Sequence, residues 1–553
     1  MKKILGVFSF AFLLATAAKA QGVLPHGWHL KDKQSTGYNG ISLDKAYTFL
    51  KEKKLKSNQV VVAVIDSGID TLHEDLKQVL WTNSKEIPGN GIDDDRNGFI
   101  DDIHGWNFLG GKDGRNVDKD SYEAARVYYA GKAKFENNTT EWKGTDAEEY
   151  KDWVRAKSSV LDVNQDEISF IKKILPRFNS GDSIIQKELG KVEYSIKDLK
   201  AYHPTNLLAG FVKNFLEGMG RANNSEDITN KQMKDQMEGE IAKADAALKP
   251  PPNYRADIVK DNENDINDRY YGNNDLMAGT PFHGTHCAGI IAADRTNKKG
   301  IDGIADNVRI MVLRAVPDGD EHDKDIANAV RYAVDNGAKV ISMSFGKSFS
   351  PQKQWVDDAF KYANSKGVLL VHAAGNDSKN IDTTFSFPNA YFKDGSGTAT
   401  NLITVGASGD PKDGDLVASF SNYGKRVDVF APGEQIYSTI PGGDNYGNAS
   451  GTSMACPVVA GIASLIWEYY PKLTPQQVKT AIEKSVYIPT ENVVNPETQE
   501  KVKLSALSRT GGIVNAYEAL KYADQIANGN TQTVVTKNKT KNGKTKMKVK
   551  SKQ

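Results

Sequence analysis

An unbroken apolar run at residues 60–65, with the sequence Val-Val-Val-Ala-Val-Ile, limits the possible folds of this chain most strongly. A strand with one face in water alternates apolar and polar residues, whereas this run presents apolar side chains to both faces. It therefore predicts a strand buried inside a parallel sheet. The run ends at Asp66, and open α/β sheets place their active sites at the carboxyl ends of such strands. Asp66 is thus the first candidate functional residue.

Similar apolar segments recur downstream and alternate with helical patterns. Strands are predicted over residues 308–313, 340–344, 368–371 and 402–405. Helices are predicted over residues 43–55, 324–336 and 355–365, and the last two each end at a glycine. Strands that alternate with helices indicate an α/β fold, with a doubly wound, mostly parallel sheet and helices on both faces.

Residues 111–264 follow a different pattern. They are rich in Lys, Glu, Asp and Tyr, and their apolar residues recur at helical spacing. The segment closes near Pro250–Pro252, a stiff break in the chain. We predict a helical insertion within the α/β domain. Its apolar stripes comprise Tyr150, Trp153, Val154 and Leu161; Ile168, Ile171, Ile174 and Leu175; and Leu207, Leu208, Phe211, Phe215 and Leu216.

The two ends of the chain have distinct compositions. Lys2 and Lys3 precede an apolar run at residues 4–18, and Ala18-Lys19-Ala20 offers small residues for cleavage before Gln21. This pattern predicts a secretory signal peptide over residues 1–20, and hence a secreted or periplasmic protein. Residues 526–553 are rich in lysine and lack acidic residues. They predict a disordered basic tail, either a surface-binding arm or, as we favour, a solvated segment.

These boundaries leave residues 21–110 and 265–525 as the two parts of the α/β domain, with the insertion over 111–264 between them. Lys and Arg total 71 and Asp and Glu total 70, for a net charge of +1. Because the chain lacks a basic excess, we expect no nucleic-acid partner. No apolar run long enough to span a membrane follows the first 20 residues, so we expect no membrane span.

Three segments carry chemistry when they are taken together: 64–68 with Asp66, 283–289 with His283, and 451–457 with Ser453. Acyl transfer to a serine needs a base for the hydroxyl proton, a carboxylate that holds the base in one tautomer, and donors for the oxyanion. Each segment alone is weak evidence, since Asp-Ser-Gly is common in turns. Together, and in the order Asp, His, Ser, they favour a catalytic triad.

With these motifs in this order, the chain resembles the subtilisin-like serine proteases, or subtilases, over about residues 40–108 and 265–525. The resemblance implies that Asp66 orients His283, the general base and acid, and that Ser453 is the nucleophile. It implies that Asn376 and the backbone N–H of Ser453 stabilise the oxyanion. It further implies an extended peptide or protein substrate that pairs with a strand beside the specificity pocket. The substrate-binding residues that it implies are Ser344, Phe345, Gly346, Ala374 and Gly375.

The chain also departs from compact subtilases. The stretch between Asp66 and His283 is several-fold longer, mostly because of the insertion. Lys347 stands where compact members have a second glycine; it is either a cation that changes which side chain the pocket accepts, or a solvated lysine. Cys287 and Cys456 are either buried free thiols, which we favour, or a disulfide.

An acidic, glycine-punctuated loop spans residues 90–102. Several of its oxygen-bearing residues follow the spacing of an EF-hand-like loop, although His104 replaces the final glutamate. The loop predicts a structural Ca²⁺ site, with a solvated acidic turn as the alternative. The predicted ligands are Asp93, Asp95, Asn97, the carbonyl of Phe99, and Asp101.

The sequence thus favours a secreted serine endopeptidase that works through an acyl-enzyme on Ser453. The alternative is a catalytically silent peptide-binding protein on the same scaffold, although Asp66, His283, Asn376 and Ser453 are all present. A serine esterase would carry Gly-x-Ser-x-Gly and the order Ser, Asp, His, and the chain has neither. A calcium-dependent adhesion module would explain the acidic loop alone.

Overall fold

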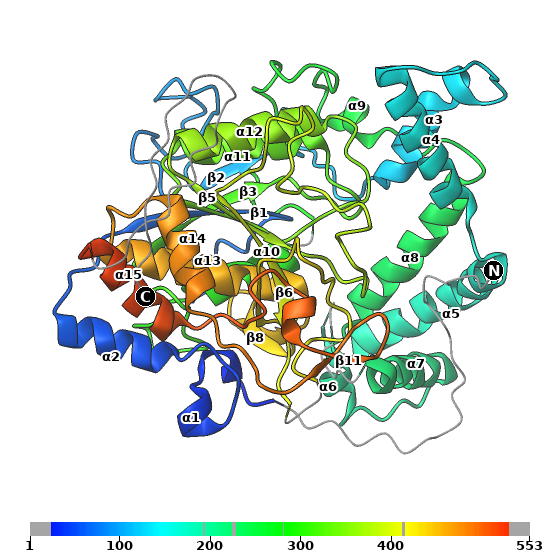
Figure 1. Cartoon of the computed structure of the whole chain (residues 1–553). Helices are drawn as coiled ribbons and strands as arrows, with labels where there is room; N and C mark the ends of the chain where they lie inside the picture. The colour runs from blue at the N-terminus through cyan, green and yellow to red at the C-terminus, as the bar shows by residue number, and fades with distance from the viewer. Residues whose placement is uncertain (1–23, 192–193, 224–227, 280, 412–414, 530–553) are drawn as a thin grey trace.

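The computed structural model describes residues 24–191, 194–223, 228–279, 281–411 and 415–529. At its centre is a seven-stranded sheet in the order β2-β3-β1-β4-β5-β6-β7, in which every neighbouring pair is parallel (Figure 1). The α/β fold predicted from the sequence is confirmed. The strands are β1 Val60–Asp66, β2 Gly105–Asn107, β3 Val308–Arg314, β4 Val340–Met343, β5 Leu369–Ala373, β6 Leu402–Ser408 and β7 Val429–Pro432.

Strand β1 lies inside the sheet, between β3 and β4. It pairs with β3 along its whole length, from Val60 opposite Val308 to Asp66 opposite Arg314. Every residue of β1 except Val61 is buried, which accounts for the unbroken apolar run, since both faces need apolar partners. Asp66 therefore stands at the carboxyl edge of the sheet, within its interior.

Helices cover both faces of the sheet (Figure 1). On one face, α10 and α13 share an apolar core with α2, α14 and α15. On the other face, α11 and α12 form the second core. Val64 of β1 belongs to the first core and Ile65 to the second. The bounds are α2 Leu43–Lys53, α10 Phe282–Ala292, α11 Asp323–Asp335, α12 Lys353–Ser365, α13 Thr452–Tyr469, α14 Pro475–Lys484 and α15 Ala516–Ala527.

The strands and helices predicted for this domain lie within a few residues of the observed ones. Strands β2 and β7 were not predicted, because β2 has only three residues and β7 ends in Ala-Pro, two residue types that are depleted in strands. Small elements complete the domain: η1 Trp28–Leu30, α1 Lys33–Thr36, the antiparallel pair β8 Ile436–Ile440 and β9 Asn445–Ala449, the antiparallel pair β10 Val493–Val494 and β11 Lys501–Val502, and η2 Leu504–Ala506.

Residues 111–264 contain α3 to α9, which Figure 1 shows to one side of the sheet. One apolar cluster lies between α3 and α4 around Phe135 and Trp153, and another joins α5, α7 and α8 around Phe178. Just outside the segment, the backbone N–H of Asn107 donates to the carbonyl of Asn273 at 2.9 Å, and the reverse bond is 3.0 Å. The helices are α3 Glu123–Phe135, α4 Thr145–Leu161, α5 Gln165–Leu189, α6 Ile196–Leu199, α7 Leu207–Asn223, α8 Asn230–Ala246 and α9 Tyr254–Ile258.

Helix α4 buries a different face from the one that its apolar stripe predicts. Val154 and Leu161 are 44% and 48% exposed, whereas Trp153, Ala156 and Val160 are buried. Helix α3 packs against α4 at the small side chain of Ala156. Nothing about an alanine in the sequence indicated that it would make this contact. The expected face was therefore wrong by about one residue position.

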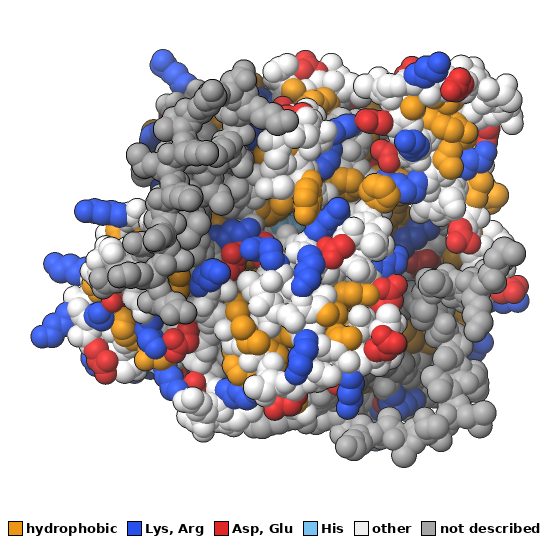
Figure 2. Space-filling view, viewed as in Figure 1, with side chains coloured by type: hydrophobic (Ala, Val, Ile, Leu, Met, Phe, Trp, Pro, Cys, Tyr) orange, Lys and Arg blue, Asp and Glu red, His pale blue; other side chains and the backbone are white. Residues whose placement is uncertain are grey.

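In the part of the chain that the structure describes, no helix is both long and apolar enough to cross a membrane. Acidic and basic side chains are interspersed on the face shown in Figure 2. The predicted signal peptide and residues 530–553 of the predicted tail lie outside the described residues. The first two residues of that tail, 526 and 527, are instead the last two residues of α15.

The α5 core offers a test of the insertion's packing. Phe178 is fully buried and Phe170, on the same helix, is 41% exposed. Phe178→Ala should lower the free energy of unfolding by about 3–5 kcal/mol, because it opens a cavity. The matched Phe170→Ala should cost less than about 1 kcal/mol. Urea denaturation followed by circular dichroism measures both, and equal losses would contradict the packing described.

Candidate active site

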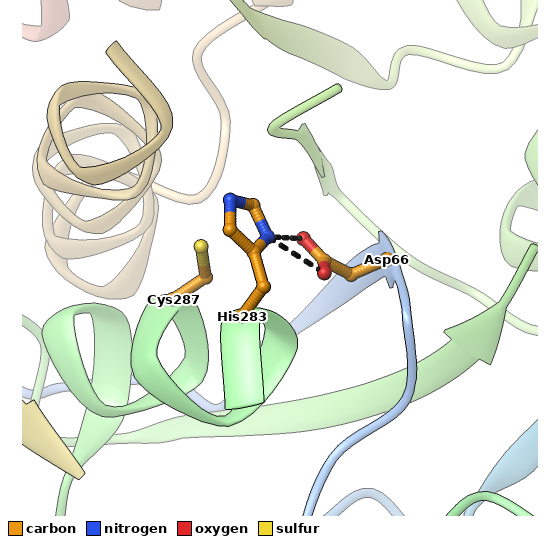
Figure 3. A group of neighbouring side chains, drawn as sticks. All are labelled: Asp66, His283 and Cys287. Carbon is orange, nitrogen blue, oxygen red and sulfur yellow. Dashed lines mark hydrogen bonds and ion pairs between the residues drawn. The ribbon is translucent and has the colours of Figure 1, made fainter. Parts of the chain in front are cut away.

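Asp66 and His283 meet at the carboxyl edge of the sheet. Asp66 is the last residue of β1, and His283 is the second residue of α10. Imidazole Nδ1 lies 2.8 Å from Oδ1 of Asp66 and 2.9 Å from Oδ2. The Asp66 side chain is 3% exposed and that of His283 is 38% exposed. Figure 3 shows the second ring nitrogen, Nε2, pointing away from Asp66. Nδ1 therefore carries the proton, and Nε2 is free to accept one.

The carboxylate also sets the basicity of the imidazole. Burial acts to lower the pKa of His283, but the negative charge of Asp66 and its hydrogen bond outweigh burial. The pKa of His283 is consequently above its ordinary value. A base raised in this way accepts a proton more readily, and the imidazolium that forms is stabilised by Asp66.

Cys287 lies beside this pair, one turn along α10 (Figure 3). Its Sγ, a carboxylate oxygen of Asp66 and a ring nitrogen of His283 all lie within 4.8 Å of one another. Burial raises the pKa of the Cys287 thiol well above its ordinary value, so the sulfur stays protonated and is a poor nucleophile or metal ligand. The thiol donates instead to the carbonyl of Ser453 at 3.4 Å. This contact brings the start of α13 to the Asp66–His283 pair.

Ser453 is the second residue of α13. Its hydroxyl donates to the carbonyl of Ser344 at 3.1 Å, and the hydroxyl of Ser344 donates to the carbonyl of Ser453 at 2.9 Å. Within the described residues, Ser453 makes no hydrogen bond to His283. Hydrogen bonds between catalytic groups are often long or poorly aligned in substrate-free sites and tighten only in the complex with substrate.

Asn376 is held with its amide nitrogen free. Its Oδ1 accepts from the backbone N–H of Thr452 at 2.8 Å and from the Thr452 hydroxyl at 2.9 Å. Thr452 also accepts from the backbone N–H of Gly375 at 3.0 Å. Nδ2 of Asn376 makes no hydrogen bond to any described residue, so it is available as a donor. Sequence reasoning missed Thr452, although its place directly before Ser453 was a signal.

One cavity of about 1220 Å³ brings the predicted substrate-binding residues together. The part of its wall at Phe345 is held in place by His372, whose Nε2 donates to the carbonyl of Phe345 at 2.8 Å. Burial lowers the pKa of His372 to about 4, so this histidine is neutral and acts only as a structural donor. The cavity lining includes Ser344, Phe345, Gly346, Ala374, Gly375, Asn376, Thr452 and Ser453.

The structure resolves two alternatives left by the sequence. Cys287 and Cys456 are both buried free thiols, as we favoured, and not a disulfide. Lys347 is not a solvated lysine, since its side chain is 2% exposed. Its ammonium points into a cluster of acidic groups rather than into solvent.

In the acidic loop, Asp93 and Asp95 lie together with Glu86, and one carboxylate oxygen from each falls within 4.8 Å of the others. Three negative charges at this separation repel one another. A divalent cation that prefers oxygen ligands, such as Ca²⁺, would relieve the repulsion, so the donor set fits the predicted ion. Glu86 was missed because it precedes the EF-hand-like spacing.

The other predicted ligands face different partners. The Asp101 carboxylate accepts from the backbone N–H groups of Gly89, Asn90 and Gly91, at 2.8 to 3.2 Å. The amide oxygen of Asn97 accepts from the N–H of Phe99 at 2.8 Å. Phe99 was predicted to bind through its carbonyl, and its side chain, which is buried among aromatic rings, anchors that part of the loop. These residues shape the loop around the three carboxylates.

Comparison with known proteins agrees with this geometry. A model of the Subtilase family matches residues 57–513. A thermophilic serine proteinase of Bacillus sp. (strain AK1) is 39% identical over 241 residues, which cover 43% of this chain and 52% of that protein. Thermitase of Thermoactinomyces vulgaris is also 39% identical over 241 residues, covering 43% of this chain and 75% of thermitase. The chain therefore spans about half the length of the first relative.

The matched range includes β1, α10 and α13, the elements that carry Asp66, His283 and Ser453. A match over most of the sequence, together with the seven-stranded parallel sheet, shows that this chain belongs to the subtilase family.

Proposed function

We propose that this protein is an exported serine endopeptidase that hydrolyses peptide bonds through an acyl-enzyme on Ser453. The observation that carries the proposal is the doubly bonded Asp66–His283 pair beside a cavity lined by Ser453 and Asn376. The serine proteinases among its relatives support the same reaction class.

In the proposed reaction, an extended peptide lies along Ser344–Gly346. The Ser453 hydroxyl turns toward His283, transfers its proton to Nε2, and attacks the scissile carbonyl. Nδ2 of Asn376 and the backbone N–H of Ser453 stabilise the oxyanion; that N–H lies in the first turn of α13, so it has no acceptor within the helix. His283 then protonates the leaving amine, and water hydrolyses the acyl-enzyme by the same route.

A second candidate is a catalytically silent peptide-binding protein. In its favour, the Ser453 hydroxyl donates to Ser344 and not to His283. Such a protein would still bind extended peptides in the cavity. Covalent labelling of Ser453 distinguishes the two candidates, because only an assembled triad activates the hydroxyl.

We further propose that the protein is exported to the periplasm or the medium, on the basis of the signal-peptide pattern at residues 1–20. We also propose that Glu86, Asp93 and Asp95 hold a structural Ca²⁺ ion. The ion would neutralise the crowded carboxylates and stabilise the loop that follows β1. Export favours this assignment, since extracellular calcium sites fill at millimolar concentrations.

The first test is labelling with a serine-reactive fluorophosphonate, together with hydrolysis of a peptide substrate. Ser453→Ala should abolish both, because the nucleophile is gone. Asn376→Ala should lower kcat by about 10²- to 10³-fold, the loss that subtilisin itself shows when it loses one oxyanion donor. If wild type were never labelled while binding peptides, the silent alternative would replace the proposal.

The pH dependence follows from the raised pKa of His283. Below that pKa the imidazole is protonated and cannot accept the Ser453 proton. We therefore expect kcat/KM to rise with pH through a midpoint above 6.5, the ordinary histidine value. In a Ser453→Ala background, NMR titration of His283 should show a lower pKa after Asp66→Asn. A midpoint below 6.5 would contradict the proposed role of Asp66.

Calcium removal tests the acidic loop. A chelator should lower the Tm of wild type, because binding to the folded state alone stabilises it. Asp93→Asn or Asp95→Asn should abolish this chelator effect. Asp94→Asn is the matched control, since the Asp94 carboxylate accepts instead from the N–H of Ile87 and the amide of Asn90. An unchanged wild-type Tm with chelator would refute the calcium proposal.

A further inference from the structure

Lys347, directly after the substrate-binding residues 344–346, projects into a buried acidic cluster. Its Nζ lies 2.7 Å from Oε2 of Glu123 and 2.9 Å from Oδ1 of Asp323, and it donates to the carbonyl of Glu321 at 2.6 Å. The side chains of Lys347, Glu123 and Asp323 are 2%, 6% and 3% exposed. An ammonium buried this deeply needs charged partners, and all of its donors find acceptors here.

The backbone of Lys347 is fixed as well. Its N–H donates to the carbonyl of Phe387 at 3.0 Å, and its carbonyl accepts from the N–H of Phe387 at 2.9 Å. The main chain and the side chain of Lys347 are therefore held by different elements. Because Lys347 directly follows Gly346, the contacts that fix Lys347 also fix the position of the last substrate-binding residue.

One of the partners of Lys347 comes from the insertion. Glu123 is the first residue of α3, and its N–H donates to Oδ2 of Asp320 at 2.7 Å. Its carboxylate also accepts from Arg126 at 2.7 Å. Burial opposes the charge on both Lys347 and Glu123, but attraction within the cluster outweighs it; the pKa of Lys347 is raised and that of Glu123 lowered. Both groups therefore stay charged, and the start of α3 is tied to the cleft.

Helix α4 makes a second, independent contact with the same region. The guanidinium of Arg155 lies 4.1 Å from the ring centroid of Phe349 and 3.7 Å from that of Phe385. Its Nη1 donates to the carbonyl of Ser348 at 2.8 Å. Phe349 follows the substrate-binding residues, and Phe385 lies two positions before Phe387. Arg155 thus joins the two segments that pair at Lys347.

The cavity is lined by both the α/β domain and the insertion. Its lining includes Ser453 and Gly346 together with Tyr122, Val160 and Ile168, which lie before α3, in α4 and in α5. The insertion helices are therefore walls of the cavity beside Ser453. A peptide that follows this part of the cavity away from Ser453 contacts them.

From these contacts we propose that the insertion is a constituent wall of the substrate cleft, and that Lys347 is a positioning residue that locks the substrate-binding residues 344–346 to it through Glu123. The inference rests on the proposed peptidase function. A peptide that pairs with these residues depends on their exact placement, whereas a small reagent at Ser453 does not. Lys347 therefore controls recognition of extended substrates rather than the chemistry at Ser453.

The test compares two substrates of the full-length protein: a tetrapeptide amide, which pairs with the substrate-binding residues, and a single-residue ester, which does not. Lys347→Met and Glu123→Gln should each lower the ratio of kcat/KM for the amide to that for the ester by about 10- to 100-fold, mainly through KM. The double variant should lose no more than the worse single variant, because the two residues act as one unit. Lys361→Met, on the surface of α12, is the control and should keep the wild-type ratio.

Fluorophosphonate labelling gives the fraction of active sites in each variant, so that a general loss of folding is not mistaken for lost recognition. If Lys347→Met fails to fold, Glu123→Gln carries the comparison, since Asp323 still partners Lys347 in that variant. An unchanged ratio in folded, labelled variants would overturn the inference alone. A wild type that is not labelled and hydrolyses neither substrate would overturn the proposed function, and the inference with it.

Discussion

Parallel pairing of β1 with β3 on one side and β4 on the other is the constraint on which the rest of the structure depends. A strand in this position must be apolar on both faces, so its first polar residue falls where the sheet ends. That residue is Asp66. Helices α10 and α13 pack on the same face of the sheet, and their first turns bring His283 and Ser453 to this edge. The arrangement of the site thus follows from the burial of one strand.

Much of the fold could be predicted because its signals are local. Five of the seven sheet strands can be recognised as apolar runs, and the helices between them end at glycines or show a clear period. The segments around Asp66, His283 and Ser453 could be found for the same reason, since each carries its own short motif. Family resemblance then supplied Asn376 and the predicted substrate-binding residues, and the structure brings those residues together with Ser453 around one cavity.

The contacts that could not be predicted join residues far apart in the sequence. No residue close to Lys347 in the sequence indicates that Glu123 will pair with it. Likewise, no residue close to Asp93 in the sequence indicates that Glu86 will lie beside it. The exposure of Val154 could not be predicted for the same reason, because the position of α3 decides which face of α4 is buried. Patterns within one segment report how apolar each face is; they do not report which charged or small residue of another segment will meet it.

The reciprocal backbone bonds between Asn107 and Asn273 have a consequence for how such a chain folds. Strands β1 and β3 are neighbours in the sheet but are separated in sequence by the entire insertion, and long-range parallel pairing of this kind is slow. If the locally connected helices α3 to α9 form first, the Asn107–Asn273 bonds act as a cross-link that holds the two ends of the insertion together. The loop that β1 and β3 must still close then contains only the residues on either side of those bonds. The entropic cost of closing this loop is then smaller, so an insertion that lengthens the chain does not slow the pairing of β1 with β3 to the same extent.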